Sequence, residues 1–260
     1  LVKANAGSAG VDQQSLEDFE RDLKGNLYKL WNRLASGSYF PPPVLMVEIP
    51  KAQGGVRTLG IPTVADRIAQ AVVKAYLEPE LESHFHPDSY GYRPGKSALE
   101  AVGVARKRCW RRAWVLDLDI RAYFDTIPHD LLLKAVRKHT DCAWVLLYIE
   151  RWLKAPMQAE DGTLCSRGKG FPQSSVISPL LANIYLHYVL DEWFEQEVKP
   201  RLRGRAWEVR YADDFILCFQ YREDAQRVLR VLHQRFARYG LSLHPDKTRL
   251  LEFGRNAQAQ

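Results

Sequence analysis

Four aspartates lie where the sequence predicts the ends of two strands. Asp213 and Asp214 sit between two runs of alternating apolar residues, and Asp117 and Asp119 close an earlier apolar run. If these strands are neighbours, at least three carboxylates meet at one sheet edge, where divalent cations must neutralise them. Hard oxygen ligands suit Mg²⁺, and two Mg²⁺ ions about 3.5–4 Å apart promote phosphoryl transfer. An isolated Asp-Asp pair is more often a polar turn, but strand formers flank this pair on both sides.

Hydrophobic periodicity predicts the elements that position these acids. The order strand, helices, strand, strand, helix, strand in the second half indicates a split βαβ, ferredoxin-like layout and an α+β fold. The expected helices cover residues 16–34, 65–81, 97–111, 129–139, 143–153, 179–189 and 222–239, and the expected strands cover residues 44–50, 56–61, 114–119, 207–211, 215–219 and 248–253.

The charge balance favours a polyanionic partner. The formal net charge is +6 and the pI is about 9.1, and basic residues gather around two tryptophans. Basic side chains track phosphates and aromatic rings stack on bases, although two solvated helix ends would give the same pattern. The first cluster is Arg106, Lys107, Arg108, Arg111 and Arg112 around Trp110, and the second is Lys199, Arg201, Arg203 and Arg205 before Trp207.

The remaining composition excludes several classes of protein. The four cysteines form no C-x-x-C pair, so neither a zinc site nor a disulfide framework is indicated. No apolar run approaches the roughly 18 residues of a membrane-spanning helix, and no signal peptide is evident. We therefore expect no membrane partner and a cytoplasmic location in a bacterium or archaeon. Because the chain begins at Leu1 rather than Met, we also expect a piece of a longer protein.

Several motifs resemble those of reverse transcriptases, and in particular those encoded by group II introns. Tyr211-Ala-Asp-Asp214 matches their YxDD box, and Asp119-Ile-Arg-Ala-Tyr-Phe-Asp125 resembles their first catalytic motif. The stretch 171–185, beginning Phe-Pro-Gln-Ser-Ser, resembles the group II intron form of the motif that holds nucleotide and template. Further similar segments are 60–70 and 89–97, which resemble fingers motifs, and 239–248, which resembles the motif after the catalytic hairpin.

The resemblance implies a right-hand polymerase with fingers and palm. It places the fingers at residues 1–112 and the palm, built on the antiparallel split βαβ sheet, at residues 113–260. The stretch around 134–170 is expected to return toward the fingers, and no thumb is expected in this chain.

The same resemblance assigns catalytic roles. It makes Asp119, Asp213 and Asp214 the metal-binding acids, with the Ile120 carbonyl as an extra ligand. Period-two alternation alone leaves Asp117 and Asp119 equivalent. The family spacing favours Asp119, since Phe124 then matches the ring that blocks a ribose 2′-hydroxyl and selects dNTPs.

Nucleotide-binding roles follow by the same correspondence. Lys51 and Arg57 match fingers cations that hold the triphosphate, Gln173 matches a residue that positions nucleotide or template, and Lys247 is placed to protonate pyrophosphate. Surface charges would explain the three cations equally simply.

Template or primer contacts are expected at Arg93, Pro172 and Tyr211. One departure from the family pattern concerns Ser174-Ser175, where the family usually has Gly-Gly. A Cβ there enters a region that the backbone of the family approaches closely.

These features predict an RNA-directed DNA polymerase that uses two Mg²⁺ ions, with Mn²⁺ as a substitute. The expected partners are an RNA template, a DNA or RNA primer, dNTPs and intron RNA. The alternative is an RNA-binding, maturase-like splicing cofactor with weak or vestigial polymerase activity. A nucleotide cyclase on a similar palm would leave the motif around Gln173 unexplained.

Overall fold

The computed structural model describes residues 2–5, 7–50, 54–111 and 113–253. The chain divides into two compact units. Unit 1 comprises Leu1–Glu80 and Pro128–Leu181, and unit 2 comprises Leu81–Ile127 and Ala182–Gln260. Helices α3 (Val64–Glu82) and α8 (Ser178–Leu186) each include residues of both units. Among the described residues, no helix combines the length and apolar character needed to span a membrane.

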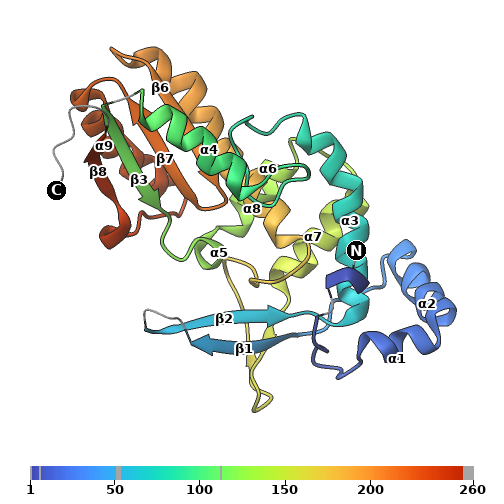
Figure 1. The fold of residues 1–260 in the computed structure, drawn as a ribbon. Coiled ribbons are helices and arrows are strands. Elements are labelled where there is room, and N and C mark those ends of the chain that lie inside the picture. The colour runs from blue at the N-terminus through green and yellow to red at the C-terminus, as the bar shows by residue number, and fades with distance from the viewer. Residues whose placement is uncertain (1, 6, 51–53, 112, 254–260) are drawn as a thin grey trace. The chain divides into compact units, whose positions relative to one another are not determined.

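Unit 1 combines helices with a small sheet of strand order β2-β1-β4-β5 (Figure 1). The predicted hairpin 44–50 and 56–61 is present as β1 and β2, which pair antiparallel. Strands β4 and β5 were not predicted from the sequence. Each is two residues long, β4 pairs with β1, and β5 pairs only with β4 among the described strands. The elements of this unit besides α3 are η1 (Lys3–Asn5), α1 (Leu16–Arg21), α2 (Leu23–Ala35), β1 (Val44–Pro50), β2 (Val56–Ile61), α6 (His129–Val136), α7 (Ala143–Lys154), β4 (Met157–Gln158) and β5 (Leu164–Cys165).

The predicted single helix over residues 16–34 is wrong in one respect, because it is broken at Asp22. Helix α1 ends there and α2 begins there. The Asp22 carboxylate accepts a hydrogen bond from the Gly25 backbone N–H at 3.2 Å, which is an N-cap contact. Asp22 competes for backbone donors in this way, so it ends one helix and starts the next although the apolar spacing continues.

A buried carboxylate fixes the centre of unit 1. Asp66 accepts hydrogen bonds from the Tyr39 hydroxyl at 2.9 Å, the Trp152 indole at 2.7 Å and the Gln70 amide at 2.9 Å. Burial nevertheless raises the pKa of Asp66 to about 6. This cluster joins α3, α7 and the segment before β1, and it makes unit 1 sensitive to pH.

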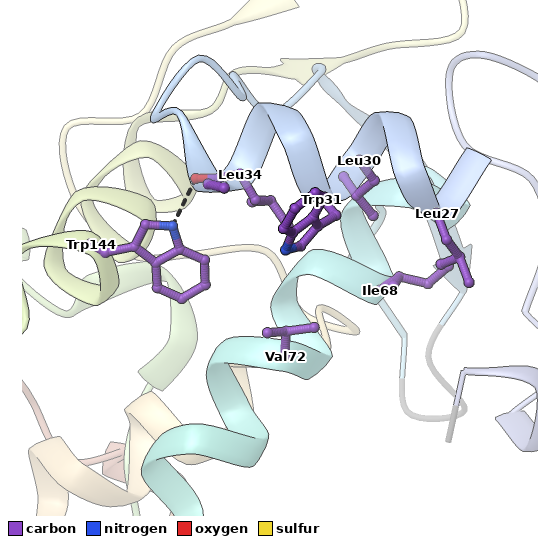
Figure 2. A pocket seen from close by; sticks show the side chains of 8 residues that line it. Leu27, Leu30, Trp31, Leu34, Ile68, Val72 and Trp144 are labelled. Carbon is purple, nitrogen blue, oxygen red and sulfur yellow. Dashed lines mark hydrogen bonds between the residues drawn. The ribbon is translucent and has the colours of Figure 1, made fainter. Parts of the chain in front are cut away.

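Helices α2, α3 and α7 of unit 1 also border an apolar groove of about 450 Å³ (Figure 2). The Trp144 indole closes one end by donating to the Leu34 carbonyl at 2.7 Å. Trp31, in the wall of the groove, is 62% exposed. Apolar side chains dominate the lining, which consists of Leu27, Leu30, Trp31, Leu34, Ala35, Ile68, Val72 and Trp144.

Unit 2 is built on an antiparallel sheet of strand order β6-β7-β3-β8. Helix α9 supplies a buried stripe, and its Phe236 ring lies 6.1 Å from the Phe215 ring of β7. Beyond α8, the chain continues through π-helical turns instead of a regular α-helix. The elements of this unit besides α8 are α4 (Ala98–Cys109), β3 (Trp114–Asp119), α5 (Tyr123–Thr126), η2 (His187–Asp191), η3 (Phe194–Val198), η4 (Lys199–Arg201), β6 (Ala206–Tyr211), β7 (Asp214–Phe219), α9 (Arg222–Arg238), η5 (Pro245–Lys247) and β8 (Arg249–Glu252).

Candidate active site

The predicted strand ends meet in unit 2. Asp119, the last residue of β3, is paired across the ladder with Asp214, the first residue of β7. Asp213 precedes Asp214 in the turn between β6 and β7. Asp117 lies two positions inside the strand, opposite Ile216 and Arg249. The register therefore brings Asp119, rather than Asp117, to the end of the sheet beside Asp214.

Electrostatics at this edge reflect three like charges. Burial, followed by the negative charges of Asp119 and Asp213, raises the pKa of Asp214 to about 6. Lys247 donates a hydrogen bond to the Asp119 carboxylate, and this contact raises the pKa of Lys247. Three carboxylates therefore meet the ammonium of Lys247 at this edge, and the negative charge of the acids favours binding of cations.

The acidic edge offers a partial set of metal ligands. Across the described residues, no three His, Cys, Asp or Glu side chains converge closely enough to hold a metal ion. Mg²⁺ is usually bound through one or two carboxylates, with water and substrate phosphates completing the shell. The carboxylates of Asp119 and Asp214 on paired strands fit that requirement. The Ile120 residue forms an isolated backbone bridge with Leu243, and its side chain is buried.

The aromatic predicted to contact the sugar lies on α5, in the same unit. Phe124 is 8% exposed, and its ring lies 5.5 Å from the ring of Tyr123. The Tyr123 hydroxyl donates to the Ala182 carbonyl at 2.6 Å, which ties α5 to α8. Tyr211 is 41% exposed and lies opposite Asp214 in the β6–β7 ladder.

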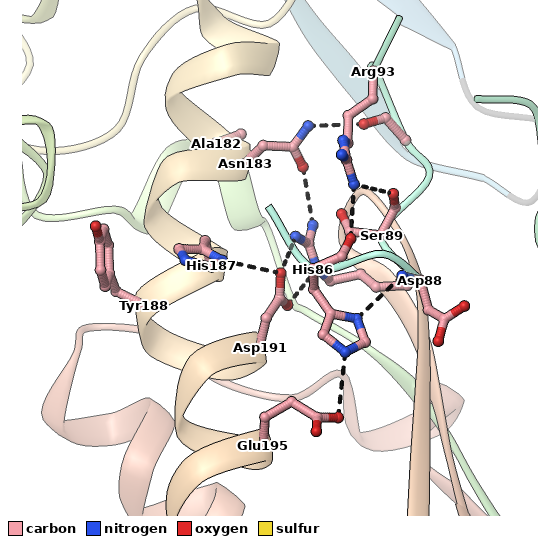
Figure 3. A network of polar contacts seen from close by, with 12 residues as sticks. His86, Asp88, Ser89, Arg93, Ala182, Asn183, His187, Tyr188, Asp191 and Glu195 are labelled. Carbon is pink, nitrogen blue, oxygen red and sulfur yellow. Dashed lines mark hydrogen bonds and ion pairs between the residues drawn. The ribbon is translucent and has the colours of Figure 1, made fainter. Parts of the chain in front are cut away.

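A buried ion pair, which sequence reasoning missed, supports the turn between β6 and β7. The Arg210 guanidinium donates to both Asp191 oxygens at 2.8 and 2.6 Å. It also donates to the Asn183 side-chain oxygen and to the Ala212 carbonyl, each at 3.0 Å. Figure 3 shows Asn183 and Asp191 extending from one helical stretch toward this centre. Arg210 thereby holds the backbone immediately before Asp213.

Glu208 lies beside Asp191 and Arg210 in the same network. Its carboxyl group is buried, and neither oxygen receives a hydrogen bond from another protein group in the described structure. Burial and the charge of Asp191 raise the pKa of Glu208 well above its usual value. A protonated Glu208 would have a hydroxyl that can donate toward Asp191. The detectable sequence signal was charged residues, Glu208 and Arg210, alternating within a predicted apolar strand.

The loop 89–97 approaches the same turn. The Tyr90 N–H donates to the Arg210 carbonyl at 2.8 Å, and the Asn183 amide donates to the Gly91 carbonyl at 2.8 Å. A Cβ on Gly91 would lie only 2.3 Å from the Ala212 backbone nitrogen. Ala212 itself has a φ of +57°, in the left-handed region. Glycine is therefore required at position 91 by a close backbone approach.

Arg93, in this loop, is directed to protein partners. It pairs with Glu82 at 2.9 Å and donates to the carbonyls of His86 and Ser89, each at 2.7 Å. These contacts give Arg93 a role in holding the loop, and its contact with template stays a prediction.

Unit 1 contains the other predicted nucleotide contacts. The Arg57 guanidinium donates to the Gln173 side-chain oxygen at 2.7 Å, so two residues far apart in sequence are neighbours. Pro172 is buried and would clash with a Cβ on Gly60, at 2.5 Å. Ser174 has a φ of +82°, so its backbone is left-handed. Lys51 lies outside the described residues.

The antiparallel split βαβ sheet, with carboxylates on two adjacent strand ends, has the arrangement predicted for a polymerase palm. The chain matches the family model "Reverse transcriptase (RNA-dependent DNA polymerase)" over residues 49–257. It therefore belongs to the reverse transcriptase family, and the predicted family and α+β fingers-and-palm fold are confirmed.

Relatives of the chain include proteins encoded by introns. Protein YkfC of Escherichia coli K12 is 36% identical over 84% of this chain and 65% of its own length. Group II intron-encoded protein LtrA of Lactococcus lactis is 31% identical over 70% of this chain and 30% of its own length. A Candida albicans telomerase structure shares the fold, with a TM-score of 0.65 and 14% identity over 94% of this chain and 46% of that one. The chain thus spans two thirds or less of these proteins.

Proposed function

We propose that this chain forms the fingers, residues 1–112, and the palm, residues 113–260, of a group II intron-type RNA-directed DNA polymerase. It would add dNTPs to a primer 3′-hydroxyl on an RNA template. The observation that carries this proposal is the pairing of Asp119 with Asp214 at one sheet edge, with Asp213 adjoining. Sequence similarity to intron-encoded proteins supports the same function.

The chemistry follows from this acidic edge. Two Mg²⁺ ions, or Mn²⁺ as a substitute, would activate the attacking hydroxyl and stabilise the departing pyrophosphate. Asp119, Asp213 and Asp214 would hold the ions, with the Ile120 carbonyl as a further ligand. Most of the rate would come from positioning and charge stabilisation.

Other residues would select and hold the substrates. Phe124 would exclude a ribose 2′-hydroxyl and so favour dNTPs. Lys51, Arg57 and Gln173 would hold the triphosphate and the templating base pair. Lys247 donates to the Asp119 carboxylate, and this contact supports a role in which its ammonium would give a proton to pyrophosphate.

A maturase-like splicing cofactor is the second candidate. Nuclear intron maturase 4 of Arabidopsis thaliana is 23% identical over 56% of this chain and 18% of its own length. The Ser174-Ser175 sequence adds side chains where the family usually has glycines. The left-handed φ of Ser174 favours retained function, because the backbone keeps a glycine-like conformation despite its Cβ. Both functions are compatible in one longer protein.

Primer extension tests the proposal. Purified protein with Mg²⁺, dNTPs and a DNA primer annealed to RNA should extend the primer. Asp213→Asn should slow extension by at least about a hundredfold, since a metal supplies several kcal/mol of transition-state stabilisation. Asp117→Asn is the matched control, because this carboxylate is two positions away from the strand end, and it should retain extension. Undiminished extension by Asp213→Asn would overturn the assignment.

A sugar-selection assay tests Phe124 separately. Phe124→Ala should raise incorporation of NTPs relative to dNTPs, measured as the ratio of kcat/KM values. An unchanged ratio would remove Phe124 from sugar selection while leaving the assignment of the acids intact.

A further inference from the structure

The end of the unit 2 sheet opposite the acids gathers the two basic clusters of the sequence. Trp114, Phe219 and Ala206 are paired across β3, β7 and β6 at this end, whereas Asp119 and Asp214 are paired at the other. Five residues of strand separate the ends, a distance of about 17 Å at roughly 3.3–3.4 Å per residue. We call this region, from Arg106 to Arg111 together with Arg203, Arg205 and Trp207, the distal surface.

A small cleft lies between α4 and β6 on the distal surface. The cleft has a volume of about 220 Å³, and it lies between the basic residues around Trp110 and the side chain of Trp207. The Arg108 side chain is held in the lining of the cleft, because it donates to the Glu208 carbonyl at 2.7 Å and pairs with Asp88. The residues that line the cleft are Val104, Lys107, Arg108, Arg111 and Trp207.

The charges of this cleft are predominantly positive. Asp88 pairs with Arg108, and the side chains of Lys107 and Arg111 are exposed in the lining of the cleft. Glu208 is buried, and burial raises the pKa of its carboxyl group well above its usual value. An anion that enters the cleft therefore meets at least two exposed cations.

Cations and aromatic rings alternate over the surrounding surface. The Arg106 guanidinium lies 4.9 Å from the centroid of the Trp110 ring, and Trp110 is 65% exposed. The Arg203 guanidinium lies 4.7 Å from the Tyr221 ring, close to exposed Arg205. Such alternation places groups that bind phosphates next to flat faces on which bases stack.

We propose that the distal surface binds a single-stranded nucleic-acid segment, separately from the catalytic acids. The exposed ring of Trp110 distinguishes this chemistry from a merely basic patch. Unpaired bases stack on aromatic and guanidinium planes, whereas a duplex hides its base faces. The backbone phosphates would contact Lys107 and Arg111, and a base would stack on Trp110. The inference does not depend on polymerase activity.

Photocrosslinking locates the contact. The probe is a 4-thiouridine RNA about 12 nucleotides long, within the range of single-strand site sizes, added with an excess of unlabelled primer–template hairpin. Mass spectrometry should find adducts on the peptides that contain Trp110 or Trp207. Adducts confined to other peptides would overturn the proposal. A matched 4-thiothymidine DNA shows whether the surface distinguishes RNA from DNA.

Charge variants supply a second test, by fluorescence anisotropy with the same RNA. Lys107→Ala with Arg111→Ala should reduce the slope of log affinity against log salt by about 1.4, for two phosphate contacts at about 0.7 each. Trp110→Ala should weaken binding at least about fivefold, and Trp110→Phe should restore much of it. The matched control removes two exposed arginines of α9 in the same unit, Arg227 and Arg230.

The outcomes separate this proposal from the proposed function. The variant that combines Lys107→Ala with Arg111→Ala should extend a short primer–template hairpin at the normal rate. Loss of extension without loss of RNA binding would instead count against the proposed function of the acids. Equal loss of RNA binding in the α9 control would reduce the effect to net charge and overturn the proposal. Equally tight binding of an RNA duplex, or equal competition by polyglutamate, would also overturn a single-strand site.

Discussion

The buried ion pair next to the β6–β7 turn gives a specific prediction for Arg210→Met. Arg210 is fully buried and donates twice to Asp191, once to Asn183 and once to Ala212. Methionine has a comparable unbranched side chain, but it leaves the Asp191 carboxylate buried without its counter-ion. We expect unfolding to become easier by about 3–5 kcal/mol, the usual effect of removing one partner of a buried pair.

The double variant Arg210→Met with Asp191→Leu removes both charges of the ion pair. It therefore distinguishes the loss of the pair's own interactions from the cost of leaving one buried carboxylate uncompensated. Replacing both ions by apolar groups is often neutral or stabilising. The Asn183 and Ala212 oxygens still lose a donor, at a cost of about 1 kcal/mol each. The double variant should therefore lose about 2 kcal/mol or less, which is a smaller loss than that of Arg210→Met alone.

Urea unfolding of each variant measures these free energies, and single-turnover extension measures positioning. Both variants lack the contact to the Ala212 carbonyl, so both should extend primers more slowly even at temperatures where they are fully folded. Arg227→Met, on the exposed face of α9, is the control and should stay within about 0.5 kcal/mol of the parent protein. A double variant at least as unstable as Arg210→Met would refute the argument that an uncompensated carboxylate causes the loss.

Three further changes test other parts of the chain. Gly91→Ala places a Cβ 2.3 Å from the Ala212 nitrogen and should slow primer extension at least about tenfold. The control is Gly103→Ala, whose Cβ would meet no atom within 4 Å and which should leave the extension rate unchanged. Ser174→Gly should stabilise the protein by about 1 kcal/mol, because glycine tolerates its φ of +82°; an unchanged urea midpoint would contradict this. The pKa of Asp66 is raised from 3.8 to about 6 in the folded state. The folded protein therefore binds this proton more tightly, and stability should fall by up to about 3 kcal/mol between pH 4 and 6, a slope that should be absent in Asp66→Asn.

Local patterns predicted the acidic edge well because the side-chain period of a strand is fixed. The alternation of Trp207, Val209 and Tyr211 with the residues after Asp214 defined a hairpin, and β6 and β7 form it. The capping box of Ser97 and Glu100 likewise marked the start of α4, where both of its hydrogen bonds are present. These signals involve residues a few positions apart, so no tertiary knowledge was needed.

Interactions between distant residues account for what the sequence did not reveal. Asp191 lies 19 residues before Arg210, in a π-helical turn that periodicity does not predict. The contact between Arg57 and Gln173 spans 116 residues. Strands β4 and β5 have too few residues for any periodic signal. Each depends on chain segments meeting in space, which a pattern within one segment cannot specify.

The buried ion pair and the strained turn have a common physical explanation in the acids above them. Burial raises the pKa of Asp214, and the negative charges of Asp119 and Asp213 raise it further, so bringing these acids together is unfavourable before any cation binds. A flexible turn would relax by moving these charges apart. Ala212 is instead held in a left-handed conformation, with Gly91 against its nitrogen and Arg210 on its carbonyl. Strained residues persist where surrounding contacts over-determine them. The bracing therefore keeps the carboxylates in a repulsive arrangement that cation binding would relieve, and weakening it should impair catalysis without any change in the acids themselves.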